Sequence, residues 1–496
     1  VLDNPAYQLP PVGSTFDGRD IFGPAAAHLC AGVPMDELGT RIDPSQLIPG
    51  VLPVRQVADD GAISAEVLWV DRFGNLQLNV DPADIEAELI AEGLFEPSGC
   101  CVVDGVIYVS QRDEVSRFTF NERGGFWDQE AVAAGWETND FHQLCCGLLH
   151  EAGDAPDHPG YLYLARSTGL GLGQNPPDHG SVWKIDLSKP AGENVTPLTG
   201  GHRAPNGIGF GPQGEVFVVE NQGGWNPANE LNHVQEGHFY GFYQRVNPPQ
   251  ANASPFQPED SANPDVPPTQ AAVKLPQHEI GNSPTQPLLF PEGHAYEGQM
   301  VMGDMHYGGI NRIYLEEVNG VWQGCAMMFT QGLEGGPNRI CWGPDGSLYV
   351  GGIGGVHHHT WWWNNPLDEP TYQGLERLVP TGEDAFEVFS MSATADGFVV
   401  RFTRPVPAAF LENVESYAMS QWTYIATRGY GGPKIDEGQL QVDSAVAAED
   451  RLSVRLIVPG LKPGYVVHLR TDPVDDDGNA IWSGDVWYTL NEVPGE

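Results

Sequence analysis

Lysine is scarce in this 496-residue chain, and long apolar runs are missing from it. The chain holds 24 basic residues against 66 acidic ones, and its formal net charge is −42. Such a surface repels phosphate backbones and anionic lipid, which argues against a nucleic acid or an anionic membrane surface as the partner. No run of 18 apolar residues occurs, so we expect no membrane-spanning helix.

Cysteine pairs with metal-binding spacing are also missing. None of the 7 cysteines forms a CxxC pair, which argues against a thiolate zinc ribbon and against covalent haem attachment. The odd number leaves at least one free thiol. We expect most of these residues to be small buried side chains in strands.

Charge and the first residues of the chain bear on the cellular location. A dense carboxylate shell suits high salt, where screening removes the self-repulsion, and is typical of a halophilic or marine source, but an acidic exported protein would look the same. No signal peptide is visible. Because the first residue is Val1, both a removed leader and a fragment stay open. We expect an extracytoplasmic protein.

One sequence pattern occurs twice in the chain. PNGIGFGPQGEVFV starts at Pro205 and PNRICWGPDGSLYV at Pro337, and a looser copy, PSGCCVVDGVIYV, starts at Pro97. Each copy reads as an apolar strand, a tight turn containing glycine and a second apolar strand. Repetition of one antiparallel unit at distant positions predicts a β-propeller, whose chemistry lies at the mouth of the central channel.

The whole chain is predicted to be mainly β, in three parts. Residues 1–90 hold the helix-like stretches GPAAAHLCAGVP and DPADIEAELIAEG and form a small α/β barrel-like fragment. Residues 91–380 carry the repeated units, and at about 40–50 residues per blade they suit roughly six blades. Residues 246–287, rich in Pro, Asn and Gln, are expected to be a surface loop. Residues 385–496 alternate as in an antiparallel β-sandwich.

Two motifs in the first part carry a resemblance. GSTFDGRDIFGPAAAHL and VDRFGNLQLNV resemble, in this order, the linker and early carboxy-terminal barrel of the S-adenosylmethionine hydroxide adenosyltransferase and halogenase family. The resemblance implies a nucleoside-binding remnant made of Thr15, Phe16, Asp71, Phe73 and Asn75.

This first part departs from that family in two ways. Asp17 stands where the hydrolase motif has a histidine that helps to activate water, and a carboxylate is no donor at neutral pH. The amino-terminal domain that supplies the family's ribose-binding aspartates is missing. A remnant or a fused structural piece is therefore expected here, and S-adenosylmethionine hydrolysis is the weaker alternative.

A second resemblance covers roughly residues 95–380. DFHQLCCGLL, HGSVWKIDL and GHRAPNGIGFGPQGEVFVVENQGG, followed by NELNHVQEGHFYGF, resemble the soluble quinoprotein sugar dehydrogenases and their sorbosone-dehydrogenase-like relatives. The resemblance implies pyrroloquinoline quinone and Ca²⁺ as cofactors, a sugar or aldehyde substrate and an external electron acceptor. It also implies that His142 is the base that takes a hydroxyl proton and that Arg203 polarises the quinone.

The remaining site residues follow from the same resemblance. The cofactor-binding candidates are Gln222, Asn206, Asn221, His306 and Arg312. The candidate calcium ligands are the carbonyls of Gly223 and Gly224, together with Glu220.

Two departures bear on this cofactor. Gly224 stands where the calcium turn has proline, and the stretch with His306 and Arg312 lacks the family's clamp lysine. A tricarboxylate cofactor then depends on calcium and Arg203 for its charge balance.

Simpler interpretations stay open for each of these residues. His142 could satisfy a blade carbonyl, Arg203 could be an inter-blade ion-pair partner, Glu220 could be an ordinary surface carboxylate, and Asn206 and Asn338 are expected in turns. The run HHHTWWWNNP could bind a metal or stack on sugar rings, but its expected role is aromatic packing that closes the last blade.

The leading functional hypothesis is a quinoprotein-type oxidoreductase that oxidises a sugar or aldehyde at the channel mouth. The alternative is a non-catalytic propeller that binds a glycan or a protein partner. The tail from FEVFSMSATADGFVVRF onwards resembles the sandwich that follows such propellers in large exported planctomycete-type proteins. The oligomeric state stays open.

Overall fold

The computed structural model divides the chain into two compact units, Val1–Glu88 and Leu89–Glu496, which are described separately. The described residues are 2, 4–8, 21–40, 56–57, 63–64, 67–70, 76–78, 90–123, 125–136, 138, 142–155, 158–169, 179–242, 268–306, 308–333, 335–353, 374–382, 385–427 and 429–495.

The first unit contains one regular helix and two short hairpins. Helix α1, Gly23–Cys30, confirms the first predicted helix; a proline in its first turn fixes the starting φ, and an alanine run follows. The second predicted helix, in DPADIEAELIAEG, lies mostly outside the described residues. The other elements are η1 (Pro5–Tyr7), η3 (Met35–Glu37), and the antiparallel pairs β1 (Gln56–Val57) with β2 (Ile63–Ser64) and β3 (Val67–Val70) with β4 (Leu76–Leu78).

The second unit begins with five groups of antiparallel strands in which each strand pairs with the next. The first group is β5 (Gly99–Val103), β6 (Val106–Ser110), β7 (Glu114–Asn121) and β8 (Phe126–Ala134); the second is β9 (Cys145–Glu151), β10 (Tyr161–Arg166), β11 (Ser181–Asp186) and β12 (Val195–Pro197). The third is β13 (Pro205–Phe210), β14 (Val216–Glu220), β15 (Asn229–His233) and β16 (Val273–Leu275). The fourth is β17 (Pro284–Leu289), β18 (Met300–Asp304), β19 (Gly309–Val318) and β20 (Val321–Gln331); the fifth is β21 (Gly336–Trp342), β22 (Leu348–Ile353) and β23 (Gly374–Leu378).

The repeated sequence pattern forms the first two strands of a group in all three copies. The copies become β5–β6, β13–β14 and β21–β22, each an antiparallel pair. The turn glycines Gly105, Gly214 and Gly346 have φ values of 80°, 94° and 76°. Only glycine adopts this left-handed conformation without strain, so the spacing of the glycines sets the turns.

The first strands of successive groups lie side by side, in the order β5, β9, β13, β17 and β21. Glycine permits this approach: a Cβ on Gly207 would lie 2.4 Å from Cα of Gln286. The series also joins its two ends, because Arg339 of β21 donates from Nε (3.1 Å) and Nη2 (2.9 Å) to the carbonyl of Ser98, just before β5. This radial order is propeller-like. The count of about six blades stays a prediction.

The surface loop expected over residues 246–287 is partly wrong. Val273 and Leu275 are fully buried, and their strand β16 pairs with β15. Their alternation places both apolar side chains in the core on one side of the sheet. Strand β17 also begins inside the expected loop, at Pro284.

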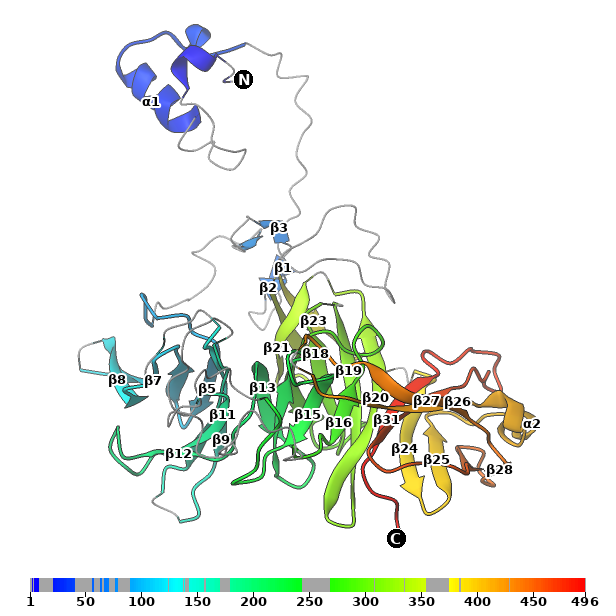
Figure 1. The fold of residues 1–496 in the computed structure, drawn as a ribbon. Helices are drawn as coiled ribbons and strands as arrows, with labels where there is room; N and C mark the ends of the chain where they lie inside the picture. Colours follow the sequence, from blue (N-terminus) through cyan, green and yellow to red (C-terminus); the bar gives the residue numbers. More distant parts are fainter. Residues whose placement is uncertain are drawn as a thin grey trace. The chain divides into compact units, whose positions relative to one another are not determined.

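The last part of the chain forms two layers of strands. One layer has the order β24 (Val388–Thr394), β25 (Gly397–Phe402), β29 (Ser453–Ile457) and β28 (Ser444–Ala447). The other has the order β31 (Asp485–Leu490), β30 (Tyr465–Arg470), β26 (Ala418–Tyr424) and β27 (Lys434–Leu440), and its β31 pairs with β20 of the fourth group. Figure 1 shows these strands, in yellow to red, beside the green β20. The short helices α2 (Ala408–Leu411) and η6 (Val414–Ser416) complete this part.

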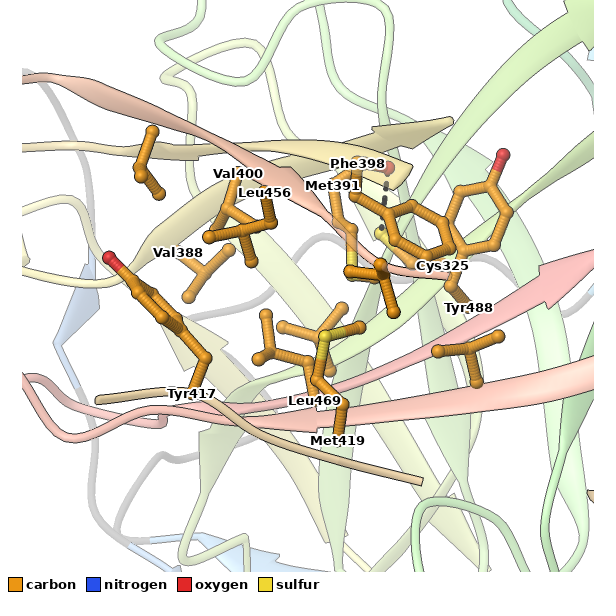
Figure 2. Close-up of a cluster of buried hydrophobic side chains, with 14 of the residues drawn as sticks. Cys325, Val388, Met391, Phe398, Val400, Tyr417, Met419, Leu456, Leu469 and Tyr488 are labelled. Atoms are coloured by element: carbon orange, nitrogen blue, oxygen red, sulfur yellow. Dashed lines mark hydrogen bonds between the residues drawn. The ribbon is translucent and has the colours of Figure 1, made fainter. Parts of the chain in front are cut away.

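A continuous apolar core fills the space between these two layers. Met391, Phe398 and Leu456 come from the first layer and meet Met419 and Leu469 from the second (Figure 2). Full burial of such a side chain stabilises the fold by about 1.5–3 kcal/mol. In the parts of the chain that the structure describes, no helix is long and apolar enough to cross a membrane.

Candidate functional site

A tight turn, Gln222–Pro227, follows β14 and carries several of the predicted site residues. The N–H of Gly223 donates to the carbonyl of Asn226 (2.9 Å), and Nε2 of Gln222 donates to the carbonyl of Pro227 (2.9 Å). Trp225 adopts φ 66°, a left-handed conformation that is uncommon for a bulky residue. The turn is therefore held by its own hydrogen bonds.

Arg203 lies directly against this turn. Its Nη1 donates to the carbonyl of Gln222 (3.0 Å), and the residue is 8% exposed. A Cβ on Gly223 would lie 2.0 Å from Nε of Arg203, so only glycine leaves room for the guanidinium. The motif thus brings Arg203, Gln222 and Gly223 together.

Glu220 fixes the backbone on which Arg203 stands. Its buried carboxylate accepts the backbone N–H groups of Arg203 (2.9 Å), Ala204 (2.6 Å) and Asn221 (3.1 Å). Nδ1 of His202 lies 3.4 Å from the same carboxylate. Glu220 is therefore not the surface carboxylate of the simpler interpretation, and its oxygens already have donors.

A second carboxylate lies beside Glu220 on the neighbouring strand. Glu230 of β15 is the Cα partner of Glu220 in β14. Burial, the largest cause, raises the pKa of Glu230 to about 7; Lys274 opposes this rise, and the charge of Glu220 adds to it. Like charges in a buried pair favour one protonated member at neutral pH.

The imidazole of His142 is joined to the main chain of Arg203 through one residue, Thr168. Nδ1 of His142 lies 3.1 Å from the carbonyl oxygen of Thr168. The N–H and Oγ1 of Thr168 both donate to the carbonyl of Arg203, at 3.0 and 2.9 Å. A carbonyl only accepts, so Nδ1 carries the proton and Nε2 the lone pair in the neutral ring. A histidine that only satisfies a carbonyl would make the same contact. The contact also favours the tautomer that a base requires, with the lone pair on Nε2.

The expectation that Asn206 and Asn338 lie in turns is wrong. Both are strand residues, in β13 and β21, and Nδ2 of Asn206 donates to Oδ1 of Asn338 (3.2 Å). Arg339 donates from Nη1 to Oδ1 of Asn206 (3.3 Å). The asparagines at the same position of two repeats therefore contact each other between β13 and β21.

Arg312 lies at a different place, the joint between β19 and the C-terminal layers. The buried guanidinium donates to Oε1 of Gln299 (2.5 Å) and to the carbonyl of Phe389 (2.7 Å), and it lies 3.4 Å from the carboxylate of Glu387. These contacts hold two strand layers together. We therefore leave Arg312 out of the proposed site.

The two other cofactor-binding candidates are placed as follows. Asn221 follows β14, and its Oδ1 is a buried oxygen without a hydrogen-bond partner in the described part of the chain. His306 follows β18, and its N–H donates to Oδ1 of Asp304 (3.0 Å). The nucleoside-binding candidates Thr15, Phe16, Asp71, Phe73 and Asn75, and the run HHHTWWWNNP, lie outside the described residues.

Two of the three predicted calcium ligands, Gly223 and Glu220, already accept hydrogen bonds. The carbonyl of Gly223 accepts the N–H of Gly431 (3.0 Å), Gly224 forms an antiparallel bridge with Tyr430, and the positive charge of Arg203 adjoins the turn. Ca²⁺ needs six to eight oxygen ligands, and a neighbouring guanidinium repels it. Calcium does not fit the turn in this arrangement. The described residues also contain no group of three or more His, Cys, Asp or Glu that could hold a metal ion.

The contribution of Tyr430 was missed at the sequence level. It lies in the loop between β26 and β27, and its ring centroid is 5.3 Å from Cζ of Arg203. The only local signal is the sequence GYGG, in which glycine flanks the tyrosine.

Comparison with known proteins finds two different likenesses, and no family model matches the chain. An (R)-S-adenosyl-L-methionine hydrolase of Salinispora arenicola is 41% identical over 86 residues, which are 17% of this chain and 33% of that protein. The Salinispora tropica hydrolase is 48% identical over 67 residues, or 14% and 25% of the two chains. The chain spans about a third or less of these relatives, so the expected resemblance to a short segment is confirmed.

Two of the solved structures that resemble the chain are described as pyrroloquinoline quinone proteins. The quinone domain of pyranose dehydrogenase from Coprinopsis cinerea has a TM-score of 0.39 and 11% identity and covers 58% of this chain and 89% of its own. The quinone-bound aldose sugar dehydrogenase of Streptomyces coelicolor has a TM-score of 0.29 and 14% identity, with coverages of 64% and 98%.

Proposed function

We propose that the protein is a quinoprotein-type oxidoreductase that acts on a sugar or an aldehyde where Arg203 and His142 adjoin Thr168. The observation that carries the proposal is the Thr168 link: one residue contacts the imidazole of His142 and the carbonyl of Arg203. The link holds the imidazole of His142 beside the main chain of Arg203, and the proposal places the substrate between that imidazole and the Arg203 guanidinium.

Each residue has a role that its contacts support. His142 would accept the hydroxyl proton at Nε2, since Nδ1 faces the carbonyl of Thr168. Arg203 would stabilise negative charge that develops on the substrate or the oxidant. Glu220 would position Arg203 through the backbone, because its carboxylate accepts the N–H of that residue.

The contacts that the chain offers to a cofactor come from Arg203 and the Gln222–Pro227 turn. Arg203 is the one predicted cation at the turn that could face a quinone carboxylate, since Arg312 is engaged elsewhere. Calcium at the turn would share the Gly223 carbonyl with the N–H of Gly431 and would lie beside the Arg203 guanidinium. We therefore assign no step to either group.

The wider organisation is also part of the proposal. We propose three domains, with a remnant over residues 1–90, a propeller of about six blades over 91–380 and a β-sandwich over 385–496. The protein would be extracytoplasmic and would pass electrons to an external acceptor. The contacts between first strands and the two-layer core support the last two domains.

A second candidate is a non-catalytic propeller that binds a glycan. The engaged oxygens of the Gln222–Pro227 turn favour it, because a protein without calcium still presents Arg203 and Tyr430.

Reconstitution tests the first candidate. The protein is incubated with pyrroloquinoline quinone and millimolar calcium, its absorption spectrum is recorded, and dye reduction is followed with aldoses and aldehydes. We expect dye reduction that falls by about 10²-fold or more in His142→Ala, the lower range for loss of a general base. His150→Ala is the matched control, since His150 of β9 contacts the carbonyl of Pro159 instead.

The outcomes separate the candidates. No spectral change and no turnover, together with sugar binding on a glycan array, would favour the binding protein. Equal turnover in the two histidine variants would refute the role of His142. Adenosine release from S-adenosylmethionine tests the weaker alternative, and we expect none.

A further inference from the structure

The loop Ile425–Pro433 reaches from the C-terminal strands to the Gln222–Pro227 turn. Three main-chain hydrogen bonds join the two segments: Trp225 N–H to Thr427 carbonyl (2.6 Å), Gly431 N–H to Gly223 carbonyl (3.0 Å) and Gly432 N–H to Pro227 carbonyl (3.1 Å). Hydrogen bonds on both sides of Tyr430 fix the position of its backbone.

Glycine is required where the loop touches the turn. Gly431 has φ 71°, and a Cβ there would lie 2.8 Å from Nε2 of Gln222. On Gly432, a Cβ would lie 2.5 Å from Cβ of Pro227. The close approach is therefore built into the residues of the loop.

Tyr430 itself is exposed although its loop is fixed. The residue is 72% exposed, and its ring centroid lies 5.3 Å from Cζ of Arg203, which is 8% exposed. An aromatic ring is thus held over the candidate site with most of its surface open to solvent. Tyrosine joins an apolar face with a polar hydroxyl, which suits ligands that have both kinds of surface.

We propose that Tyr430 is the stacking platform for a cyclic sugar at the Arg203 site, and that the C-terminal strands thereby complete this site. The C–H face of a pyranose is apolar and stacks on an aromatic ring, while its hydroxyl groups accept hydrogen bonds from a guanidinium. This inference rests on the proposed sugar substrate and adds the residue that selects rings over open-chain aldehydes.

The experiment compares cyclic and acyclic substrates. KM is measured for an aldose and for glycolaldehyde with the wild-type protein, Tyr430→Ala and Tyr430→Phe. We expect Tyr430→Ala to raise KM for the aldose at least tenfold, to leave KM for glycolaldehyde within twofold and to change kcat less than twofold. Tyr430→Phe keeps the ring and should stay within threefold of wild type.

Calorimetric titration of the aldose into the cofactor-free proteins gives a readout that needs no turnover. The same order of affinity is expected: wild type and Tyr430→Phe bind, and Tyr430→Ala binds at least tenfold more weakly. Trp482→Ala is the matched control, because Trp482 is another exposed aromatic residue of the C-terminal part, at 46%. It should bind the aldose like wild type.

The two levels of the proposal fail differently. If the wild-type protein binds and oxidises aldoses but Tyr430→Ala keeps the same preference for rings, the platform is overturned and the proposed function stands. An equal rise of KM for both substrates would show a merely structural role and would also overturn it. If the wild-type protein neither binds nor oxidises any sugar, both fail.

Discussion

Replacing Gly223 by alanine tests the packing of Arg203 on the turn. The new Cβ would lie 2.0 Å from Nε, 2.3 Å from Cδ and 2.4 Å from Cζ of Arg203, whereas ordinary contact begins at 3.4 Å. Arg203 is nearly buried, so the guanidinium cannot move by this amount and keep its 3.0 Å hydrogen bond to Gln222.

The expected cost follows from the lost contacts. A hydrogen bond from a charged group is worth about 1.5–3 kcal/mol, and overpacking costs about 1–3 kcal/mol. Partial relaxation offsets some of this sum, so we expect the free energy of unfolding to fall by about 2–4 kcal/mol. Urea titration followed by tryptophan fluorescence measures this change.

A matched control and a double-mutant cycle make this test specific. A Cβ on Gly438 would have nothing within 4 Å, so Gly438→Ala should change the free energy of unfolding by less than about 0.5 kcal/mol. In an Arg203→Ala background, Gly223→Ala should cost less than about 1 kcal/mol, because its clashing partner is gone. Equal costs with and without Arg203 would refute the described packing.

Two further predictions concern buried charges. The pKa of Glu230 is raised to about 7, so the folded state binds its proton more tightly than the unfolded state does; this stabilisation is complete below the unfolded pKa and is lost as the pH rises through 7. Glu230→Gln should therefore remove on the order of 3 kcal/mol of pH dependence between pH 4 and 8, and parallel stability curves would contradict the shift. Arg312→Ala should destabilise the protein by about 3–5 kcal/mol in urea titration, because Glu387 loses its buried partner; a loss below about 1 kcal/mol would show that the joint does not need the guanidinium.

The strand pattern could be predicted because its determinants are local. Alternating apolar residues and turn glycines specify β13–β14 and β21–β22, and the motif that contains Arg203 also contains Gly223, so their proximity follows from one hairpin. Contacts within one hairpin do not depend on how the sheets assemble.

The contacts between sheets could not be predicted in this way. Tyr430 reaches Arg203 from a loop more than 200 residues away in the sequence. Arg312 is held by Glu387 because β24, which directly follows Glu387, packs against β19 and β20. Alternation tells which face of a strand is apolar but not which sheet covers it. Arg312 was assigned to the cofactor because the sequence does not show that the C-terminal strands cover it.

A crystal structure of the protein grown with an aldose tests the central claim most directly, since that claim is that His142 and Arg203 serve one ligand. We predict electron density for one sugar within hydrogen-bonding distance of both side chains, with its ring against Tyr430. Density for the sugar elsewhere, or side chains of His142 and Arg203 that face separate ligands, would contradict the account.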